Sequence, residues 1–151
     1  MKWFVLNVGE ILIDKKYIPV VQSTIWSLIP DGYVLGSSGK YKGQLLHRVI
    51  AKLAGLDIPD EVDHINGNPR NNQILNLRPA THAENMRNRK IQSNNTSGYP
   101  GVSYRKDIQK WMAYIRINRK MKNLGYFDTA EVAYAVYCKA ARQYHGEFAR
   151  V

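Results

Sequence analysis

The sequence contains little cysteine, few acidic residues and no long apolar run. Its only cysteine is Cys138, so an internal disulfide and a zinc site built from repeated Cys-x-x-Cys motifs are both excluded. No stretch approaches the ~20 apolar residues that a membrane-spanning helix needs. We therefore expect a soluble, unexported, cytoplasmic protein with no membrane partner, stabilised by packing.

Acidic residues are scarce relative to basic ones. The 151 residues include 22 Lys and Arg against 12 Asp and Glu, which gives a formal net charge of +10. This charge attracts polyanions through a field that salt weakens, so the expected partner is nucleic acid rather than a small-molecule substrate. The excess is densest at residues 103–122, where seven basic side chains accompany one acidic side chain. The alternative explanation is a basic face that simply meets solvent.

The first part of the chain is rich in β-strand signals. Short apolar runs alternate with Pro, Gly, Asp and Ser, which is typical of strands joined by turns. We predict strands at residues 3–6, 11–13, 18–22, 32–35 and 43–46. Apolar residues then recur at helical spacing up to Gly55, a C-terminal stop, which predicts a helix over residues 47–56.

The middle of the chain carries a strand, loop, strand, helix pattern. Residues 62–65 are a predicted strand, and Asn66-Gly67 is a tight-turn signal. Thr81-His82-Ala83-Glu84 is a capping box that opens a helix ending near Arg89. Residues 92–98 are small and polar throughout, which indicates a linker. We therefore predict two domains, residues 1–92 and 93–151.

The second predicted domain consists of a three-stranded antiparallel meander and one helix. Strands are expected at residues 102–105, 111–117 and 120–125, with Asn118-Arg119 as the second turn. Asp128 or Thr129 caps the helix, which runs to about Tyr144. Its apolar stripe follows the 3.6-residue period and comprises Val132, Ala133, Val136, Tyr137, Ala140 and Ala141. The small alanines allow the helix to approach the sheet closely.

Asp63 and His64 are the most informative pair of residues. Neighbours on a strand point to opposite faces, so a site that uses both needs the end of the strand. Asn85, one turn beyond the cap at Thr81, can present a neutral oxygen toward that strand. Such oxygen ligands suit Mg²⁺ or Mn²⁺ better than Zn²⁺, and a neutral histidine accepts a proton near pH 7.

Two further histidines leave alternatives open. His47 opens the predicted helix, and His82 lies one turn before Asn85. Each is either a supporting residue behind the site or an ordinary packing residue. A structural zinc site made of His47, His64 and His82 is a third alternative, although the usual finger spacing is absent.

The segment Val62-Asp63-His64-Ile65-Asn66-Gly67, followed by Asn76-Leu77-Arg78 and the helix that contains Asn85, resembles the HNH nucleases. The similar branch is the phage and intron homing endonucleases, in which Asn replaces the final His, and the resemblance covers residues 32–89. It implies a ββα-metal fold in which Asp63 and Asn85 bind one divalent cation, His64 is the general base, and Asn76 holds the loop that orients His64. Basic residues around this site either hold the DNA backbone or are ordinary surface charges: Arg78, Arg87, Arg89 and Lys90.

Residues 97–148 resemble the APETALA2-type DNA-binding domain. The resemblance rests on Gly98-Tyr99-Pro100-Gly101-Val102, Trp111-Met112-Ala113-Tyr114-Ile115-Arg116 and Leu124-Gly125-Tyr126-Phe127-Asp128-Thr129. It implies a sheet that lies in the major groove with the helix packed behind it, and a β-sheet fits that groove. The family's contact positions correspond to Ser103, Arg105, Tyr114, Arg116, Met121 and Asn123, while Lys106, Lys110, Lys120 and Lys122 are expected to grip phosphate.

Alternation sorts the side chains of the second strand of this domain. The residues expected to face the helix are Trp111, Ala113, Ile115 and Ile117, and those expected to face DNA are Met112, Tyr114 and Arg116. Plant members of the family are richer in Arg and Trp at the contact positions, so we expect weaker sequence readout here.

Together these patterns predict an α+β protein in which a β-rich N-terminal part leads into a ββα-metal HNH nuclease, followed by a three-stranded antiparallel sheet packed on one helix. The predicted function is hydrolysis of double-stranded DNA with Mg²⁺ or Mn²⁺, by a phage-encoded or mobile-element-encoded enzyme in a bacterial cytoplasm. The main alternative is a non-catalytic, sequence-specific DNA-binding regulator that uses the HNH half as a scaffold. An RNA-binding accessory protein is less favoured, because Tyr104 and Tyr114 are the only candidate stacking platforms. The target sequence, and the choice between monomer and homodimer, stay open.

Overall fold

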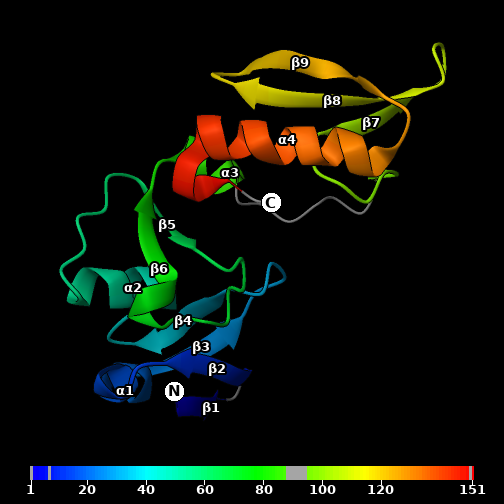
Figure 1. Ribbon diagram of the computed structural model, residues 1–151. Coiled ribbons are helices and arrows are strands. Elements are labelled where there is room, and N and C mark those ends of the chain that lie inside the picture. The colour runs from blue at the N-terminus through cyan, green and yellow to red at the C-terminus, as the bar shows by residue number, and fades with distance from the viewer. Residues whose placement is uncertain (1, 7, 88–94, 150) are drawn as a thin grey trace. The chain divides into compact units, whose positions relative to one another are not determined.

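The structure is a computed structural model that describes residues 2–6, 8–87, 95–149 and 151. The chain divides into two units, Met1–Met86 and Arg87–Val151, and each unit has a hydrophobic core of its own. Figure 1 labels their helices and strands. Within the described ranges, every helix is too short or too polar to span a lipid bilayer.

Two β-hairpins begin the first unit (Figure 1). β1 (Lys2–Leu6) pairs antiparallel with β2 (Gly9–Ile13), and β3 (Thr24–Leu28) pairs antiparallel with β4 (Val34–Gly39). The 3-10 helix Lys15–Tyr17 and the short helix α1 (Ile18–Gln22) connect the two hairpins. The first two predicted strands are thus confirmed.

Three features of this region differ from the prediction. Residues 18–22 form helix α1 instead of a strand, because Pro19 sits in the first turn, where its fixed φ and missing N–H suit a helix. β3 is an additional strand; its adjacent apolar residues Ile25 and Trp26 hide the alternation. Residues 43–46 make only one isolated bridge, from Leu45 to Leu35, before the next helix begins at Leu46.

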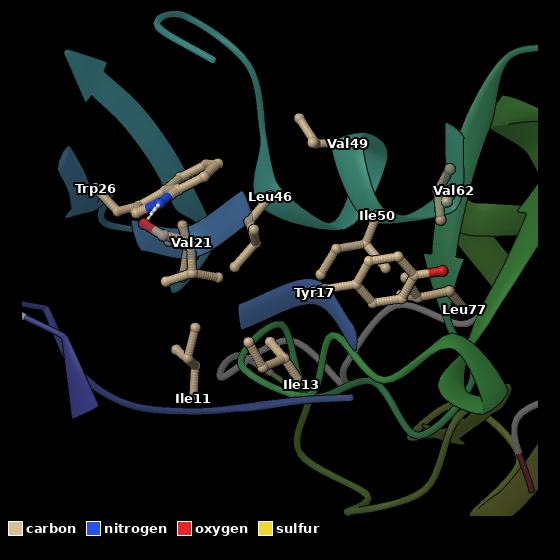
Figure 2. Close-up of a cluster of buried hydrophobic side chains, with 12 residues drawn as sticks. Ile11, Ile13, Tyr17, Val21, Trp26, Leu46, Val49, Ile50, Val62 and Leu77 are labelled. Atoms are coloured by element: carbon tan, nitrogen blue, oxygen red, sulfur yellow. Dashed lines mark hydrogen bonds between the residues drawn. The ribbon is translucent and has the colours of Figure 1, made fainter. Parts of the chain in front are cut away.

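One hydrophobic core joins these hairpins to the middle of the chain (Figure 2). The indole N–H of Trp26 donates to the carbonyl oxygen of Val21 at 2.9 Å inside this core. Side chains from β2, from α2 (Leu46–Leu53) and from the following hairpin are all buried in it, namely Ile11, Ile13, Leu46, Val49, Ile50, Val62 and Leu77. The N-terminal hairpin therefore packs directly with the segment that carries Asp63 and His64.

The middle of the chain is a hairpin followed by a helix. β5 (Glu61–His64) pairs antiparallel with β6 (Leu77–Ala80), and the 3-10 helix Ile74–Asn76 precedes β6. α3 (His82–Arg87) begins at the predicted capping box, where Thr81 N donates to Glu84 Oε2 at 2.8 Å and Glu84 N donates to Thr81 Oγ1 at 3.3 Å. The predicted end of this helix near Arg89 lies outside the described residues.

The second unit is a three-stranded antiparallel sheet with one helix along a face (Figure 1). Its strands are β7 (Val102–Arg105), β8 (Lys110–Ile117) and β9 (Lys120–Phe127), and its helix is α4 (Ala130–His145). Asn118 and Arg119 have φ values of 49° and 65°, as a two-residue type I′ hairpin turn requires. Thr129 caps α4 by accepting from Val132 N at 3.3 Å. The predicted meander and helix are confirmed.

Helix α4 contacts the sheet through small residues. Its buried side chains are Ala130, Ala133, Ala140 and Ala141. A Cβ atom at Gly101, whose φ is +66°, would lie 2.2 Å from Cδ2 of Tyr137, so the ring of Tyr137 rests on bare backbone. Val132 is 51% exposed, and its inclusion in the predicted apolar stripe is wrong, because it precedes the buried Ala133 by one residue and so lies about 100° around the helix from it.

Candidate active site

Asp63 and His64 are the last two residues of β5. Asp63 is in register with Arg78 of β6, and His64 is in register with Leu77. Each of the two residues is 4% exposed. The strand ends at His64, which is where a site that uses both neighbours must lie.

Asp63 binds a buried arginine. Its Oδ2 accepts from Arg78 Nε at 2.9 Å and from Arg78 Nη2 at 2.7 Å, and such charge-assisted bonds fix the carboxylate. Arg78 is thus buried beside Asp63. Both interpretations of the sequence, a DNA contact and an ordinary surface charge, placed it on the surface. The reason for its burial is the register, which sets Arg78 directly opposite Asp63. Arg89 and Lys90 lie outside the described residues, as does the side chain of Arg87.

Glu61 connects the hairpin to α3. It lies two residues before Asp63 on β5, so the two carboxylates share a face of the hairpin. Glu61 Oε1 lies 2.8 Å from His82 Nδ1, and Asn85 Nδ2 donates to Glu61 Oε2. The bonds from Asn85 and then His82 lower the pKa of Glu61, so this carboxylate stays ionised. Sequence reasoning missed Glu61, and its two-residue spacing from Asp63 is the signal that points to it.

The imidazole of His64 packs against two aromatic rings. Its centroid lies 4.8 Å from that of His47, edge-on, and 5.8 Å from that of Tyr33. Burial, followed by the charges of His64 and Arg48, lowers the pKa of His47 to about 3. Burial also lowers the pKa of His64, although its bond to Asn72 and the charge of Asp63 act in the opposite direction. Both rings are therefore neutral at pH 7, and His64 is able to accept a proton.

An asparagine-rich loop, residues 65–76, lies against His64. His64 Nε2 is 3.3 Å from Asn72 Oδ1. Asn76 joins the two ends of the loop, because its Oδ1 accepts from Asn66 N at 3.1 Å and its Nδ2 donates to Asn71 O at 2.7 Å. Sequence reasoning assigned no role to Asn72, since an Asn-Asn pair in such a stretch has the composition of an ordinary turn.

The oxygen atoms of Asp63 and Asn85 fit a hard divalent cation. Asn85 donates its NH₂ group to Glu61, so its carboxamide oxygen is the atom able to ligate a metal. One carboxylate and one carboxamide suit Mg²⁺, which keeps several waters and takes few protein ligands. Among the described residues, no three His, Cys, Asp or Glu side chains gather to hold a metal. The zinc alternative built on His47, His64 and His82 is therefore wrong.

The sheet of the second unit has one face under α4 and an opposite face, which we call the outer face. Directly paired residues project to the same side, and the register gives the outer face Ser103, Arg105, Lys110, Met112, Tyr114, Arg116, Met121, Asn123 and Tyr126. The residues expected under the helix do pack there: Trp111, Ala113, Ile115 and Ile117. Met112 is on the outer face but only 8% exposed, because it lies in register between Ser103 and Tyr126 on the middle strand.

Several basic residues of this sheet are engaged within the protein. Arg105 donates from Nε and Nη2 to the two carboxylate oxygens of Asp107 at 2.9 and 2.7 Å. Lys110 pairs with Asp128. Among the described residues of the outer face, Arg116 is the exposed cation that takes part in no ion pair. Lys106 is exposed in the turn between β7 and β8.

The lysines of β9 are not where the prediction put them. Lys120 and Lys122 are in register with Ile117 and Ile115, which pack toward α4, so both lysines project to the helix side. Lys122 Nζ donates to the hydroxyl of Tyr144 at 2.8 Å and lies 4.9 Å from the centre of its ring. The expected phosphate contact by Lys122 does not agree with this placement. Asn123 Oδ1 accepts from Gly125 N at 2.9 Å.

Comparison with known proteins bears on the segment that holds Asp63, His64, Asn76 and Asn85. The HNH endonuclease family matches residues 44–87. Protein 3.8 of Escherichia phage T7 is 37% identical over 112 residues, which cover 73% of this chain and 92% of that protein. The "SPbeta prophage-derived putative HNH homing endonuclease YosQ" of Bacillus subtilis (strain 168) is 35% identical over 107 residues, which cover 67% of this chain and 59% of that protein. No solved structure matches the chain.

Proposed function

Because the chain belongs to the same family as Protein 3.8 and contains an HNH endonuclease domain, we propose that it is a metal-dependent endonuclease of the phage homing type that hydrolyses double-stranded DNA. The observation that carries the proposal is the end of β5 within the matched segment. There, Glu61 holds Asn85 on the face of Asp63, and a neutral His64 follows Asp63 at the end of the strand.

His64 is the general base of the proposed reaction. Its ring is buried against His47, and burial disfavours the protonated form. A neutral imidazole can take the proton of the water that attacks the phosphate. Asn72 and Asn76 support the ring and its loop through the contacts described above.

Asp63 and Asn85 are the proposed ligands of Mg²⁺ or Mn²⁺. HNH nucleases generally use a divalent metal ion, and when bound such an ion stabilises negative charge on the phosphate and on the departing oxygen. Arg78 fixes the orientation of the Asp63 carboxylate through two hydrogen bonds to one oxygen. Glu61 accepts a hydrogen bond from the amide nitrogen of Asn85. The carboxamide oxygen of Asn85 is therefore the atom that can ligate a cation.

The outer face of the sheet is the proposed DNA-positioning surface. Arg116 and Met121 are directly opposite each other in its register, and both are exposed. The ion pairs of Arg105 and Lys110 are also exposed, and such pairs are weak enough to be exchanged for phosphate. The proposed contacts on this surface are Ser103, Arg105, Lys106, Lys110, Tyr114, Arg116 and Asn123.

Cleavage of supercoiled plasmid tests the proposal. With Mg²⁺ or Mn²⁺ the protein is expected to nick the plasmid, and with EDTA it is not. The variant His64→Ala is expected to cut ~10²–10⁴-fold more slowly, the usual effect of removing a general base, while binding DNA with unchanged affinity. Full activity of His64→Ala would rule out the mechanism. In metal titration calorimetry, Asp63→Ala and Asn85→Ala should each bind the ion more weakly than wild type.

A DNA-binding regulator without catalysis is the second candidate function. The observation in its favour is that Asp63 and His64 are each only 4% exposed, which leaves little of either for a phosphate to touch. The plasmid assay separates the two functions. Binding with no cleavage in either metal would support the regulator, and metal-dependent nicking that His64→Ala removes would support the nuclease.

A further inference from the structure

Asn72 is a buried polar residue held in one orientation beside His64. The whole residue is 1% exposed. Nδ2 donates to the carbonyl oxygen of Pro69 at 3.4 Å, and Oδ1 lies 3.3 Å from His64 Nε2. Because the amide nitrogen is turned to Pro69, the atom of the carboxamide that faces the imidazole is an oxygen.

This orientation determines which nitrogen of His64 carries the proton. A carboxamide oxygen accepts hydrogen bonds and cannot donate them, so His64 Nε2 must be the protonated nitrogen. In a neutral imidazole the lone pair then belongs to Nδ1. We propose that Asn72 is the positioning residue that keeps His64 in the Nε2-protonated tautomer and so makes Nδ1 the proton acceptor. This inference rests on the proposed nuclease function, which gives His64 its role as a base.

The backbone around Asn72 is held by the N-terminal strand β2. Leu12 N donates to Arg70 O at 2.9 Å, and Asn72 N donates to Leu12 O at 2.8 Å, so Leu12 bonds to the residues on either side of Asn71. Leu12 and Asn71 form a parallel bridge. These bonds fix the place from which the Asn72 side chain reaches His64.

A side chain just after β2 extends the same support. Asp14 Oδ2 accepts from Ile74 N at 2.9 Å, at the start of the 3-10 helix that leads into Asn76. Leu12 and Asp14 lie outside the segment that matches the HNH endonuclease family, residues 44–87. The strand β2 and the residue Asp14 after it therefore help to hold the loop through which Asn72 orients His64.

Imidazole ¹³C and ¹⁵N chemical shifts of His64, which differ between the two neutral tautomers, test the proposal directly. The metal-free full chain is measured at pH 8, where the ring is neutral. Wild type should show the Nε2-protonated tautomer, and Asn72→Ala should show a mixture. The matched control is Asn68→Ala, because Asn68 lies in the same loop and its Oδ1 accepts from Arg70 N, whereas it is the Oδ1 of Asn72 that faces His64 Nε2. Wild-type shifts in Asn72→Ala would overturn the proposal.

A conservative variant covers the case in which Asn72→Ala fails to fold. Asn72→Asp keeps an oxygen acceptor opposite Nε2 and should keep the Nε2-protonated signature. A Nδ1-protonated ring in Asn72→Asp would overturn the proposal on its own.

Cleavage rates of the same proteins separate this inference from the proposed function. Asn72→Ala should cut ~10–100-fold more slowly, as is usual when a supporting hydrogen bond behind a site is lost, with unchanged DNA affinity. If wild type has the expected tautomer and Asn72→Ala loses it, but neither cleaves DNA, the proposed function fails while Asn72 keeps its effect on His64. If wild type cleaves and Asn72→Ala matches it in rate and shifts, the inference fails and the function stands.

The contribution of β2 is tested at Asp14. Asp14→Ala removes the acceptor for Ile74 N, whereas Asp14→Asn keeps an oxygen there. Amide exchange of Ile74 should be at least tenfold faster in Asp14→Ala than in Asp14→Asn, and only Asp14→Ala should add the second tautomer of His64. Identical exchange and identical shifts in the two variants would remove β2 from the proposal.

Discussion

In the first unit the polar side chains of the candidate site lie inside the protein, whereas in the second unit the charged side chains of the sheet lie on its surface. Asp63, His64, Asn72, Asn76 and Arg78 are all buried. The side chains of Arg78 and Asp63 are 10% and 5% exposed, whereas those of Arg105 and Asp107 are 43% and 57% exposed. Both regions pair opposite charges, but only the first does so away from water.

The difference indicates two kinds of task. A buried polar network has one low-energy arrangement, because any group that loses its partner also lacks water. Such a network suits the proposed nuclease reaction, which needs atoms held in place. An exposed ion pair costs little to open, so a surface of such pairs can rearrange to follow a partner whose shape varies, as DNA does.

The largest effect on stability should come from the buried ion pair. Arg78→Ala leaves the Asp63 carboxylate buried without the arginine and should lower the free energy of unfolding by about 3–5 kcal/mol. Arg105→Ala is the matched control in the exposed pair and should leave it nearly unchanged. Urea unfolding measures both. Equal losses in the two variants would mean that burial does not distinguish the two units.

Acid should destabilise the first unit through His47. Its pKa is about 3 in the folded protein, against 6.5 for the ordinary side chain. Below pH 6.5 the unfolded chain therefore binds a proton that the folded chain excludes. Stability from this residue is complete above pH 6.5 and is lost as the pH falls toward 3, by about 2 kcal/mol between pH 7 and pH 5.

The variant His47→Phe isolates this effect, because it keeps an aromatic ring that does not titrate. Urea unfolding at pH 7 and pH 5 should show a smaller loss in His47→Phe than in wild type. The same loss in both proteins would show that His47 is not the residue responsible.

Arg116 on the outer face and Lys122 on the helix side of the sheet should have different effects on DNA binding. Arg116→Ala should weaken, by about tenfold, binding to a DNA duplex that the protein cuts. It should also lower by about 1 the slope of log affinity against log salt concentration. Lys122 points to the helix side and bonds to Tyr144, so Lys122→Ala should leave the salt slope unchanged. Binding titrations across salt concentrations measure both slopes. A drop of about 1 for Lys122→Ala would show that this lysine leaves Tyr144 for the phosphate backbone.

The smallest effect should come from opening one exposed pair. Asp107→Asn releases the guanidinium of Arg105 for phosphate and should tighten DNA binding by roughly two- to fivefold at low salt. Glu131→Gln removes the same charge from α4, on an exposed residue of the helix, and controls for the change in net charge. Equal tightening in the two variants would show a general effect of charge.

Most of the fold of the second unit can be predicted from its sequence, because the signals that determine it are local. Asn118-Arg119 fixes a hairpin turn, alternation on β8 separates its two faces, and Thr129 caps the helix. All of these signals are local. The side of the β9 lysines also follows from a local signal: the two-residue turn at Asn118-Arg119 pairs Lys120 with Ile117 and Lys122 with Ile115, on the helix side, so their expected phosphate contacts disagreed with the predicted turn itself. The register shift between Ala113 and Tyr114 lies farther along β9, and the pairing near the turn does not reveal it.

Less of the candidate site can be predicted from the sequence, because its contacts join residues far apart in the chain. The Asp-His pair and the capping box are visible in the chain. The contacts of Arg78 with Asp63 and of Glu61 with Asn85 join residues 15 and 24 positions apart, and that of Asp14 with Ile74 joins residues 60 apart. Only the paired hairpin and the packed N-terminal strands bring these residues together.

The shared core of Figure 2 bears on how an HNH domain of this kind can be transferred between proteins. Ile11, Ile13 and Trp26 pack in the same cluster as Val62 and Leu77, so the segment from 44 to 87 has no complete interior of its own. A transplant of that segment into another host protein would expose an apolar surface that residues 11–34 normally cover. The smallest portable cassette that carries Asp63 and His64 must therefore begin at β2, even though the motif itself starts some fifty residues later.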